Sequence, residues 1–251
     1  MKLTELKPPI IIAHRGYCRR YPENTLSAFA AAFEAGAQMI ELDVSLTKDG
    51  QLVVIHDATV NRTTNGRGPV KSYTLEELKR LDAGAWFQRR FSGERIPALA
   101  DVFDRFAQAG LINVEIKSHP NLNRQDIDFL RGQVAAAIRQ TGLQDRVLVS
   151  SFDTDVLEGM SEMTDPPFTA LLSSRYEGPR EVDLCRRLGV LTWHPNYRRL
   201  KAAHVHMMHA AGILVFPYTV NLRGDARRLL RLEVDGLFSD DPRLLKACLA
   251  D

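Results

Sequence analysis

The sequence is poor in cysteine, in long apolar runs and in charge of one sign. Its three cysteines, Cys18, Cys185 and Cys248, are odd in number and scattered, which excludes a disulfide framework and favours a reducing compartment. No apolar run approaches the roughly 20 residues of a transmembrane helix, so we expect no stable membrane insertion. Residues 1–9 carry no apolar stretch typical of a secretory signal, and we therefore expect a cytoplasmic protein.

The charges nearly balance, with 33 Lys and Arg against 31 Asp and Glu and a formal net charge of +2. This balance provides no electrostatic reason to expect nucleic acid as a partner. Apolar residues make up 45% and charged residues 25%, which is average for a globular protein and excludes fibrous or disordered chains. The length of 251 residues suits one large domain or two small ones, while the oligomeric state stays open.

Short apolar segments alternate with stretches that have the spacing of helices, such as Leu26, Phe29, Ala30 and Phe33. This alternation predicts parallel strands joined by helices. The candidate strands are Pro9–Ala13, Met39–Ser45, Leu52–His56, Leu111–Ile116, Val147–Ser151, Phe168–Leu172, Val190–His194, Ile213–Tyr218 and Gly236–Ser239.

The second and third candidate strands are too close for a helix between them. The Asp-Gly pair at 49–50 predicts a two-residue hairpin turn in which Lys48 pairs with Gln51. In that register Asp43 lies opposite His56, and Glu41 shares the same face. Without the hairpin strand, eight strands remain, which predicts a (β/α)8 TIM-type barrel as one domain over residues 1–251.

The connection after the hairpin is unusually long, and we expect residues 57–98 to form a small inserted subdomain. Thr74 and Glu77 have the spacing of a capping box, which predicts a short helix. Trp86, Phe87 and Phe91 are expected to form the core of this subdomain, with contact to acyl chains as the alternative.

Charged and histidine side chains stand at the ends of several predicted strands, where buried faces normally carry aliphatic residues. In a barrel, the carboxyl ends of all strands meet at one rim, and active sites lie there. The residues concerned are His14, Arg15, Glu41, Asp43, His56, Glu115 and Lys117.

Three of these residues, Glu41, Asp43 and Glu115, are carboxylates suited to one hard divalent cation, Mg²⁺ or Ca²⁺. The alternative is that they pair with neighbouring cationic side chains and bind no metal. We favour the metal, because three acids without a cation would repel one another.

The other four residues suit phosphate chemistry. Arg15 and Lys117 can contact phosphate oxygens. His14 and His56 titrate near neutral pH and can transfer protons. Together with a cation they predict phosphodiester cleavage, in which one imidazole takes a proton and the other protonates the leaving alkoxide. The remaining histidines of interest are interpreted as ordinary core or surface residues, namely His119, His204, His206 and His209.

Some neighbouring residues are assigned supporting roles. Asn24 or Thr25 is expected to cap the helix that starts at Leu26. Asp57 is expected to brace its loop or to orient His56. Cys18 is interpreted as a bystander thiol.

An ordered set of motifs resembles the glycerophosphodiester phosphodiesterase family of bacterial type, from about residue 9 to the C-terminus. The resemblance is specific because many short motifs match in order. They are His14–Gly16, Pro22–Thr25, Glu41–Val44, His56–Asp57, Arg62–Gly66, Leu81–Gly84, Ile96–Pro97, Glu115–Lys117, Ser150–Phe152 and Thr219–Asn221.

The resemblance implies a TIM-like barrel that hydrolyses small glycerophosphodiesters, such as glycerophosphocholine or glycerophosphoethanolamine, to sn-glycerol 3-phosphate and an alcohol. In related barrel phospholipases a substrate hydroxyl attacks phosphorus to give a cyclic phosphate, and the glycerol 2-hydroxyl could do so here. Which histidine is the acid is left open. The implied roles are acid and base for His14 and His56, phosphate contact for Arg15 and Lys117, and metal binding for Glu41, Asp43 and Glu115.

The sequence departs from the family at Tyr218, where tryptophan is frequent. Trp193 is predicted to bind substrate on the alcohol side of the pocket, with ordinary barrel packing as the alternative. One rival function is a lysophospholipase D acting on acylated substrates. Another is a catalytically silent barrel that binds phosphodiesters, although a pure binder has no need for two proton-transfer groups.

Overall fold

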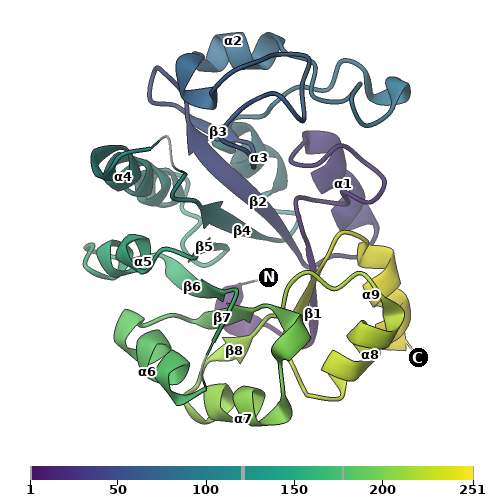
Figure 1. Cartoon of the computed structure of the whole chain (residues 1–251), viewed down its shortest axis with the longest axis vertical. Coiled ribbons are helices and arrows are strands. Elements are labelled where there is room, and N and C mark those ends of the chain that lie inside the picture. Colours follow the sequence, from purple (N-terminus) through teal and green to yellow (C-terminus); the bar gives the residue numbers. More distant parts are fainter. Residues whose placement is uncertain (1, 120–121, 177, 251) are drawn as a thin grey trace.

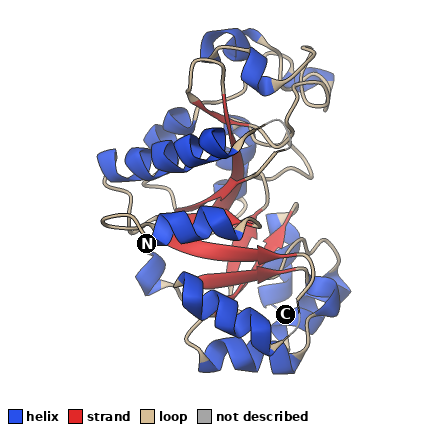
Figure 2. Ribbon diagram, turned by 60° about the vertical axis from the view of Figure 1, so that its left-hand side comes forward, coloured by secondary structure: helices blue, strands red, loops and turns tan. Residues whose placement is uncertain are grey.

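The computed structural model describes residues 2–119, 122–176 and 178–250, and its strands form a barrel wall surrounded by helices (Figure 1, Figure 2). Hydrogen-bonded neighbours follow the order β8-β7-β6-β5-β4-β2-β1-β9, and all these neighbours are parallel. The strands are β1 (Ile10–Ala13), β2 (Met39–Leu46), β3 (Leu52–Val54), β4 (Leu111–Ile116), β5 (Val147–Ser151), β6 (Phe168–Ser173), β7 (Thr192–Pro195), β8 (Leu214–Val215) and β9 (Gly236–Ser239).

The two ends of the sheet, β8 and β9, meet and nearly close the barrel. The backbone N–H of Asp235 donates to the carbonyl of Val215 at 3.0 Å, and that of Phe238 donates to Pro217 at 3.1 Å. Helices follow the strands around the ring, as an eight-fold barrel requires. The predicted (β/α)8 TIM-type barrel is therefore confirmed.

The helices cover the outside of the barrel, except for α2 in the β3–α3 connection (Figure 1). The hydroxyl of Thr25 caps α1 by accepting a hydrogen bond from the N–H of Ala28, and Gly36 follows its end with a left-handed φ of 97°. The helices are α1 (Leu26–Glu34), α2 (Leu75–Arg80), α3 (Leu99–Phe106), α4 (Arg124–Gln140), α5 (Thr154–Ser161), α6 (Pro179–Leu188), α7 (Ala202–Ala210), α8 (Arg223–Leu230) and α9 (Pro242–Ala250). None of the described helices is long and apolar enough to cross a bilayer.

Alternation along the strands divides the apolar core into two layers. In β1, Ile11 packs with the surrounding helices, whereas Ile10 and Ile12 belong to a cluster inside the barrel. Met39 and Leu111, the first residues of β2 and β4, belong to the same inner cluster. Because apolar side chains fill the N-terminal end of the barrel, the C-terminal end is left for polar chemistry.

Strand β3 folds back on β2 as predicted, but the register differs by one residue. Leu46 lies opposite Leu52. The N–H of Ile55 donates to the carbonyl of Asp43 at 3.0 Å, so Asp43 pairs with Ile55. The predicted pairing of Asp43 with His56 is therefore wrong.

The reason lies in the hairpin loop, which has three residues instead of two. The N–H of Thr47 donates to the carbonyl of Gln51 at 3.1 Å, so residues 48–50 form the loop, and Lys48 does not pair with Gln51. Gly50 takes a left-handed φ of 72°, as the last residue of such a loop commonly does. The hydroxyl of Thr47 accepts a further hydrogen bond from the N–H of Gln51 at 2.9 Å. An Asp-Gly pair suits both loop lengths, and this hydroxyl favours the longer one.

The connection over residues 57–98 projects beyond the barrel wall at the top of Figure 1. Within this connection, helix α2 starts with the predicted capping box, in which the side chain of Glu77 accepts a hydrogen bond from the N–H of Thr74 at 2.8 Å. Aliphatic residues of the connection pack with β3 in a separate cluster. Its buried members are Val53, Ile55, Val60, Val70, Leu78, Ala83 and Ile96.

Trp86, Phe87 and Phe91 lie outside that cluster, so the prediction that these three residues form the core of the subdomain is wrong. Trp86 is 38% exposed. The ring of Phe87 lies 5.7 Å from Trp86 and 5.8 Å from Phe91, and Phe91 lies 5.3 Å from Tyr21 in the β1–α1 loop. The rings thus form a row that joins the connection to the barrel.

Candidate active site

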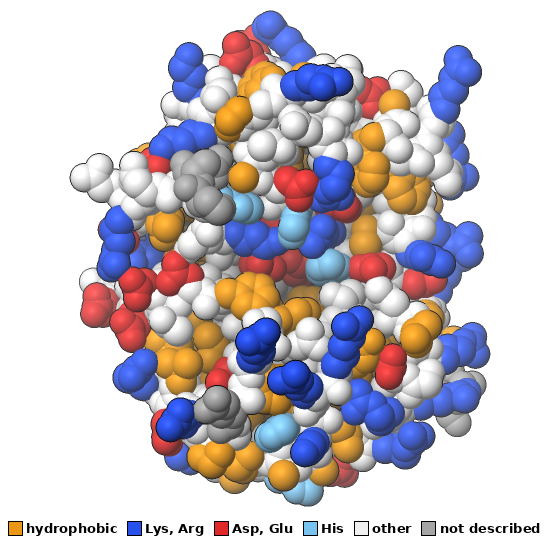
Figure 3. Space-filling model, viewed as in Figure 1, with side chains coloured by type: hydrophobic (Ala, Val, Ile, Leu, Met, Phe, Trp, Pro, Cys, Tyr) orange, Lys and Arg blue, Asp and Glu red, His pale blue; other side chains and the backbone are white. Residues whose placement is uncertain are grey.

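A cavity of about 570 Å³ opens at the C-terminal ends of the barrel strands. Figure 3 shows a hollow near the middle of this face, where acidic, basic and histidine side chains gather. Six of the seven charged and histidine residues predicted at the strand ends line the cavity. The seventh, Asp43, is buried against Arg15 and Lys117, which line it. The lining residues are His14, Arg15, Glu41, His56, Asn113, Glu115, Ile116, Lys117, Ser118, His119, Ser151, Phe152, Asp153, Leu172, Tyr218, Thr219 and Phe238.

The three predicted metal ligands form one buried cluster. Strand alternation turns Glu41 and Asp43 to the same face of β2, and Asp43 is the direct neighbour of Glu115 on β4. One oxygen from each carboxylate lies within 4.8 Å of the others. The three residues are only 1%, 1% and 7% exposed.

Burial and mutual repulsion act strongly on these acids. Burial and the charge of Asp43 raise the pKa of Glu41, and the same two causes raise the pKa of Glu115 to about 8. At Asp43 burial favours the neutral acid, yet Lys117 and Arg15 outweigh it and hold the pKa of Asp43 well below its usual range. Burial and repulsion thus disfavour negative charge on this cluster, and a bound cation would stabilise the ionised carboxylates.

The donor set fits a hard divalent cation. The Oε1 atom of Glu41 is buried without a hydrogen-bond partner. All the converging donor atoms are carboxylate oxygens, the ligands that Mg²⁺ and Ca²⁺ prefer. The side-chain amide of Asn24, which was predicted as a possible helix cap, instead donates to Oδ2 of Asp43 at 2.8 Å and holds that carboxylate in place.

Two cationic side chains lie against the same carboxylates. The Nζ atom of Lys117 is 2.6 Å from Oδ1 of Asp43 and 3.5 Å from Oε1 of Glu115. Arg15 lies two residues after the end of β1 in a left-handed conformation, with φ of 53°, and its backbone N–H donates to Oε2 of Glu41 at 2.8 Å. Its guanidinium lies 3.4 Å from Asp43. Lys117 and Arg15 are therefore able to share a bound phosphate with a cation.

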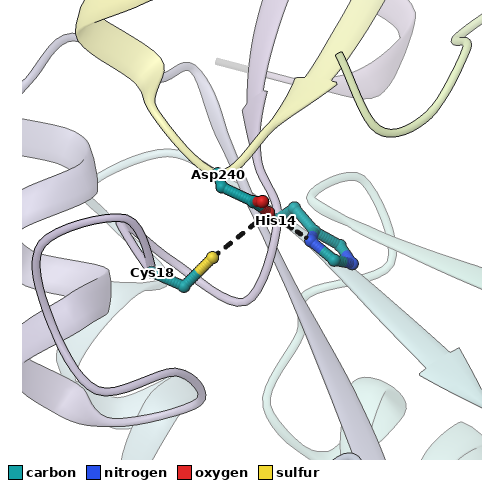
Figure 4. A group of neighbouring side chains, drawn as sticks. All are labelled: His14, Cys18 and Asp240. Atoms are coloured by element: carbon teal, nitrogen blue, oxygen red, sulfur yellow. Dashed lines mark hydrogen bonds and ion pairs between the residues drawn. The ribbon is translucent and has the colours of Figure 1, made fainter. Parts of the chain in front are cut away.

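Each candidate catalytic histidine has a carboxylate on Nδ1. His14 Nδ1 lies 2.7 Å from Oδ1 of Asp240, as Figure 4 shows, and His56 Nδ1 lies 2.6 Å from Oδ1 of Asp57. With Nδ1 engaged, Nε2 is the nitrogen left for the cavity that both rings line. Asp57 thus orients His56, as one of the two predicted roles proposed.

The environments of the two histidines move their pKa values in opposite directions. Burial, aided by the cations Lys117 and Arg15, outweighs the carboxylates that would raise the pKa of His56 and lowers it. Burial would also lower the pKa of His14, but its hydrogen bond to Asp240 and the charge of Glu41 outweigh burial and raise it. At neutral pH this favours a neutral His56 and a protonated His14.

An ion-pair network behind the cavity links His56 to Arg15. Arg62 donates to Oδ2 of Asp57 at 2.7 Å and to both oxygens of Glu23 at 2.8 Å. Glu23 in turn accepts from Nη1 of Arg15 at 2.9 Å. The motif positions of Glu23 and Arg62 are visible in the sequence, but their pairing is not.

Asp240 is the functional candidate that sequence reasoning missed. It follows β9 directly and lies 226 positions from His14 in the chain. Its second oxygen, Oδ2, accepts from the amide of Asn221 at 2.6 Å, which fixes the carboxylate. The available signal was its place at the end of a barrel strand that neighbours β1.

Two interpretations made from the sequence need correction. Trp193 does not line the cavity. It is buried on the helix side of β7, where its ring lies 4.8 Å from that of Tyr176 and its Nε1 donates to Ser173 at 3.1 Å. Alternation explains this placement, because His194 next to it points to the barrel interior, 5.5 Å from Phe216. Conversely, His119 was set aside as ordinary, yet it lines the cavity and its Nε2 is buried without a hydrogen-bond partner.

Known proteins of similar sequence and fold show the family of this chain. The model of the glycerophosphoryl diester phosphodiesterase family matches residues 14–244. A glycerophosphodiester phosphodiesterase of Caldanaerobacter subterraneus is 41% identical over 241 residues, 94% of this chain and 96% of the relative. One from Bacillus altitudinis is 38% identical over 240 residues, with coverage of 92% and 94%. The structure of an Oleispira antarctica phosphodiesterase in complex with its product sn-glycerol-3-phosphate has a TM-score of 0.89 and 28% identity, with coverage of 97% and 98%.

A barrel with a cavity lined by acidic, basic and histidine side chains at its strand ends thus has counterparts among phosphodiesterases. The chain belongs to the glycerophosphoryl diester phosphodiesterase family. It is a phosphoric diester hydrolase with glycerophosphodiester phosphodiesterase activity.

Proposed function

We propose that this enzyme cleaves small glycerophosphodiesters, such as glycerophosphocholine, to sn-glycerol 3-phosphate and an alcohol, using one divalent cation and two histidines. The observation that carries the proposal is that two His–Asp pairs and a cluster of three buried carboxylates meet at one cavity, which His14, His56, Glu41 and Glu115 line. The product bound to the Oleispira antarctica relative supports the choice of product.

Glu41, Asp43 and Glu115 would hold Mg²⁺ or Ca²⁺. When bound, such a cation draws charge from the phosphoryl oxygens and makes phosphorus easier to attack. Arg15 and Lys117 would contact the remaining phosphate oxygens, since both already lie against Asp43 at the cavity wall.

We assign His56 as the base and His14 as the acid. The neutral Nε2 of His56 takes the proton from the hydroxyl that attacks phosphorus, because burial and nearby cations lower the pKa of this ring. If water attacks, sn-glycerol 3-phosphate forms directly; if the glycerol 2-hydroxyl attacks, water then opens the cyclic phosphate to the same product. The protonated His14 gives its Nε2 proton to the leaving alkoxide, because Asp240 helps to raise the pKa of His14. Asp240 and Asp57 keep the two rings in the required orientation.

The substitution Asp240→Asn tests this assignment through pH dependence. Activity should fall at low pH as His56 becomes protonated and at high pH as His14 loses its proton. Because Asp240 raises the pKa of His14, the variant should lose activity at a lower pH on the alkaline side, while the acidic side stays in place. The measurement is kcat/KM for glycerophosphocholine against pH.

A matched control is Asp241→Asn, since the Asp241 carboxylate accepts hydrogen bonds from the first turn of α9, whereas His14 is paired with Asp240. Its profile should equal that of the wild type. An unchanged alkaline side in Asp240→Asn would contradict the assignment of His14 as the acid.

An aromatic wall points to the alcohol that is released. Phe152 is 47% exposed, lines the cavity and meets the ring of Tyr218 edge-on at 5.9 Å. Aromatic faces attract quaternary ammonium groups, so we propose that this wall favours a choline leaving group.

Phe152→Ala should therefore lower kcat/KM for glycerophosphocholine roughly threefold to tenfold, the range of a cation–π contact. The value for glycerophosphoglycerol, whose alcohol is uncharged, should change less. Phe129→Ala, which removes a similarly exposed ring on α4, serves as the control. Equal losses on both substrates would argue against an ammonium-selective wall.

The proposed substrate class is tested by comparing glycerophosphocholine with lysophosphatidylcholine, its acylated counterpart. A coupled assay for sn-glycerol 3-phosphate and one for choline should show faster cleavage of glycerophosphocholine. Cleavage of the acylated substrate alone would favour the lysophospholipase D alternative.

We further propose that residues 57–98 act as an inserted subdomain that holds Asp57 and Arg62 against the barrel, which the Arg62–Glu23 ion pair supports.

We also propose a cytoplasmic location, which is supported by the three free cysteines.

A further inference from the structure

A second group of metal-ligating side chains lies beside the carboxylate cluster. It consists of His14, Cys18 and Asp240, and one donor atom from each lies within 4.8 Å of the others. Figure 4 shows the thiol of Cys18 and the ring of His14 converging on the carboxylate of Asp240. In the part of the chain that the structure describes, this is the group that includes nitrogen and sulfur donors.

The barrel topology brings these residues together. His14 follows β1, Cys18 lies four residues later in the β1–α1 loop, and Asp240 follows the neighbouring strand β9. Oδ1 of Asp240 lies 2.7 Å from Nδ1 of His14 and accepts from Sγ of Cys18 at 3.2 Å. Both contacts use the same oxygen, so three donor atoms already surround one small volume.

The spacing suits a tetrahedral ion after a small adjustment. Zinc bonds of about 2.0 Å to nitrogen and oxygen and about 2.3 Å to sulfur place the ligand atoms roughly 3.3–3.6 Å apart. The two contacts of Asp240 would each lengthen by less than about 1 Å to reach this geometry. A nitrogen, sulfur and oxygen donor set selects Zn²⁺, whereas the cluster made only of carboxylates selects Mg²⁺ or Ca²⁺.

We propose that His14, Cys18 and Asp240 form a separate binding site for Zn²⁺ and that its occupation inhibits the enzyme. Binding would replace the thiol proton of Cys18 and any proton on Nδ1 of His14, and both protons pass to solvent. With its Nδ1 lone pair given to the metal, His14 cannot become the imidazolium that protonates the leaving alkoxide. This inhibitory part rests on the proposed function, but the binding part does not.

Cys18 belongs to the proposed Zn²⁺ site but has no role in the proposed mechanism, so substitutions at Cys18 can test the site separately from catalysis. Burial, and then Asp240, raise the pKa of its thiol well above the usual range, so Cys18 is not an activated nucleophile in the metal-free protein. The other two cysteines, Cys185 and Cys248, are buried on α6 and α9. A serine at position 18 can donate the same hydrogen bond to Asp240 but binds zinc far less well.

The binding part is tested with Co²⁺, which replaces Zn²⁺ and gives a near-ultraviolet charge-transfer band when a thiolate binds it. The full-length protein is titrated with Co²⁺ in excess Mg²⁺, which keeps the carboxylate cluster occupied. We expect the band in the wild type and in Glu115→Gln, and its loss in Cys18→Ser. Absence of the band in the wild type, or its persistence in Cys18→Ser, would overturn the site.

The inhibitory part is tested by adding Zn²⁺ to the glycerophosphocholine assay in excess Mg²⁺. Cys18→Ser should keep the basal rate. It should need at least roughly tenfold more Zn²⁺ for half inhibition, because losing a metal ligand should weaken Zn²⁺ binding at least as much as losing a residue that only supports a ligand. Cys18→Ala gives a second thiol-free variant. Equal Zn²⁺ sensitivity in all three proteins would overturn the inhibition. If the wild type did not cleave glycerophosphocholine, the cobalt spectrum would still decide the site.

Discussion

A p-nitrophenyl ester of glycerol 3-phosphate is expected to restore most of the activity that His14→Ala loses on glycerophosphocholine. The nitrophenolate ion departs without receiving a proton, so this substrate does not need the acid that we assign to His14. On glycerophosphocholine, loss of a general acid should lower kcat by roughly 10²–10⁴-fold. The measurement is kcat on both substrates for the wild type and the variant.

His56→Ala should lose activity on both substrates, because the base is needed whatever group leaves. His206→Ala, at an exposed position on α7, is the matched control and should keep the wild-type rates on both. If the two active-site variants exchanged their patterns, the roles of acid and base would be reversed. Wild-type rates in either variant would remove that histidine from the mechanism.

Glu115→Gln is expected to abolish most of the activity and yet to stabilise the metal-free protein. Activity falls because one of three proposed cation ligands loses its charge. Stability rises because burial and Asp43 raise the pKa of Glu115 from 4.5 to about 8 in the folded protein. The carboxyl therefore ionises more easily in the unfolded chain than in the folded protein. Such a group lowers the free energy of unfolding as the pH rises from its unfolded pKa to its folded pKa. At pH 7 glutamine should remove a penalty of about 3 kcal/mol.

The measurement is urea unfolding of chelator-treated wild type and Glu115→Gln at pH 5 and pH 8. The advantage of the variant should be small at pH 5 and larger at pH 8. Glu158→Gln on the outer helix α5 should show no such trend, since Glu158 is about half exposed. A variant that is less stable than the chelated wild type at pH 8 would show that the three acids do not repel one another.

Most of the fold follows from local sequence patterns, because each strand is a short apolar run and most strands are followed by helical spacing. The prediction of the hairpin register failed because two loop lengths suit the same residues. The Asp-Gly pair fits a turn of two residues as well as a loop of three, and the hydroxyl of Thr47 supports the longer loop. That single extra loop residue moves Asp43 opposite Ile55 and changes the whole hairpin register.

The site was predictable where chemistry sits on strand ends and unpredictable where it depends on long-range contact. His14, Glu41 and Glu115 stand out because charge is costly on a buried strand. Asp240 carries no such mark, and only the pairing of β9 with β1, strands far apart in the chain, brings it to His14. Trp193 was placed on the wrong face because this strand is buried on both sides, so the polar neighbours Thr192 and His194 did not show which side faces the cavity.

The most direct test of the proposed mechanism is sn-glycerol 3-phosphate release from glycerophosphocholine by the chelator-treated wild type during titration with Mg²⁺ or Ca²⁺. We expect no release in the chelated protein and recovery as the cation is added back. The Glu41→Gln variant should need at least roughly tenfold more cation to recover half of its maximal activity. Undiminished release in the chelated wild type would contradict the proposal that a cation held by Glu41, Asp43 and Glu115 takes part in hydrolysis.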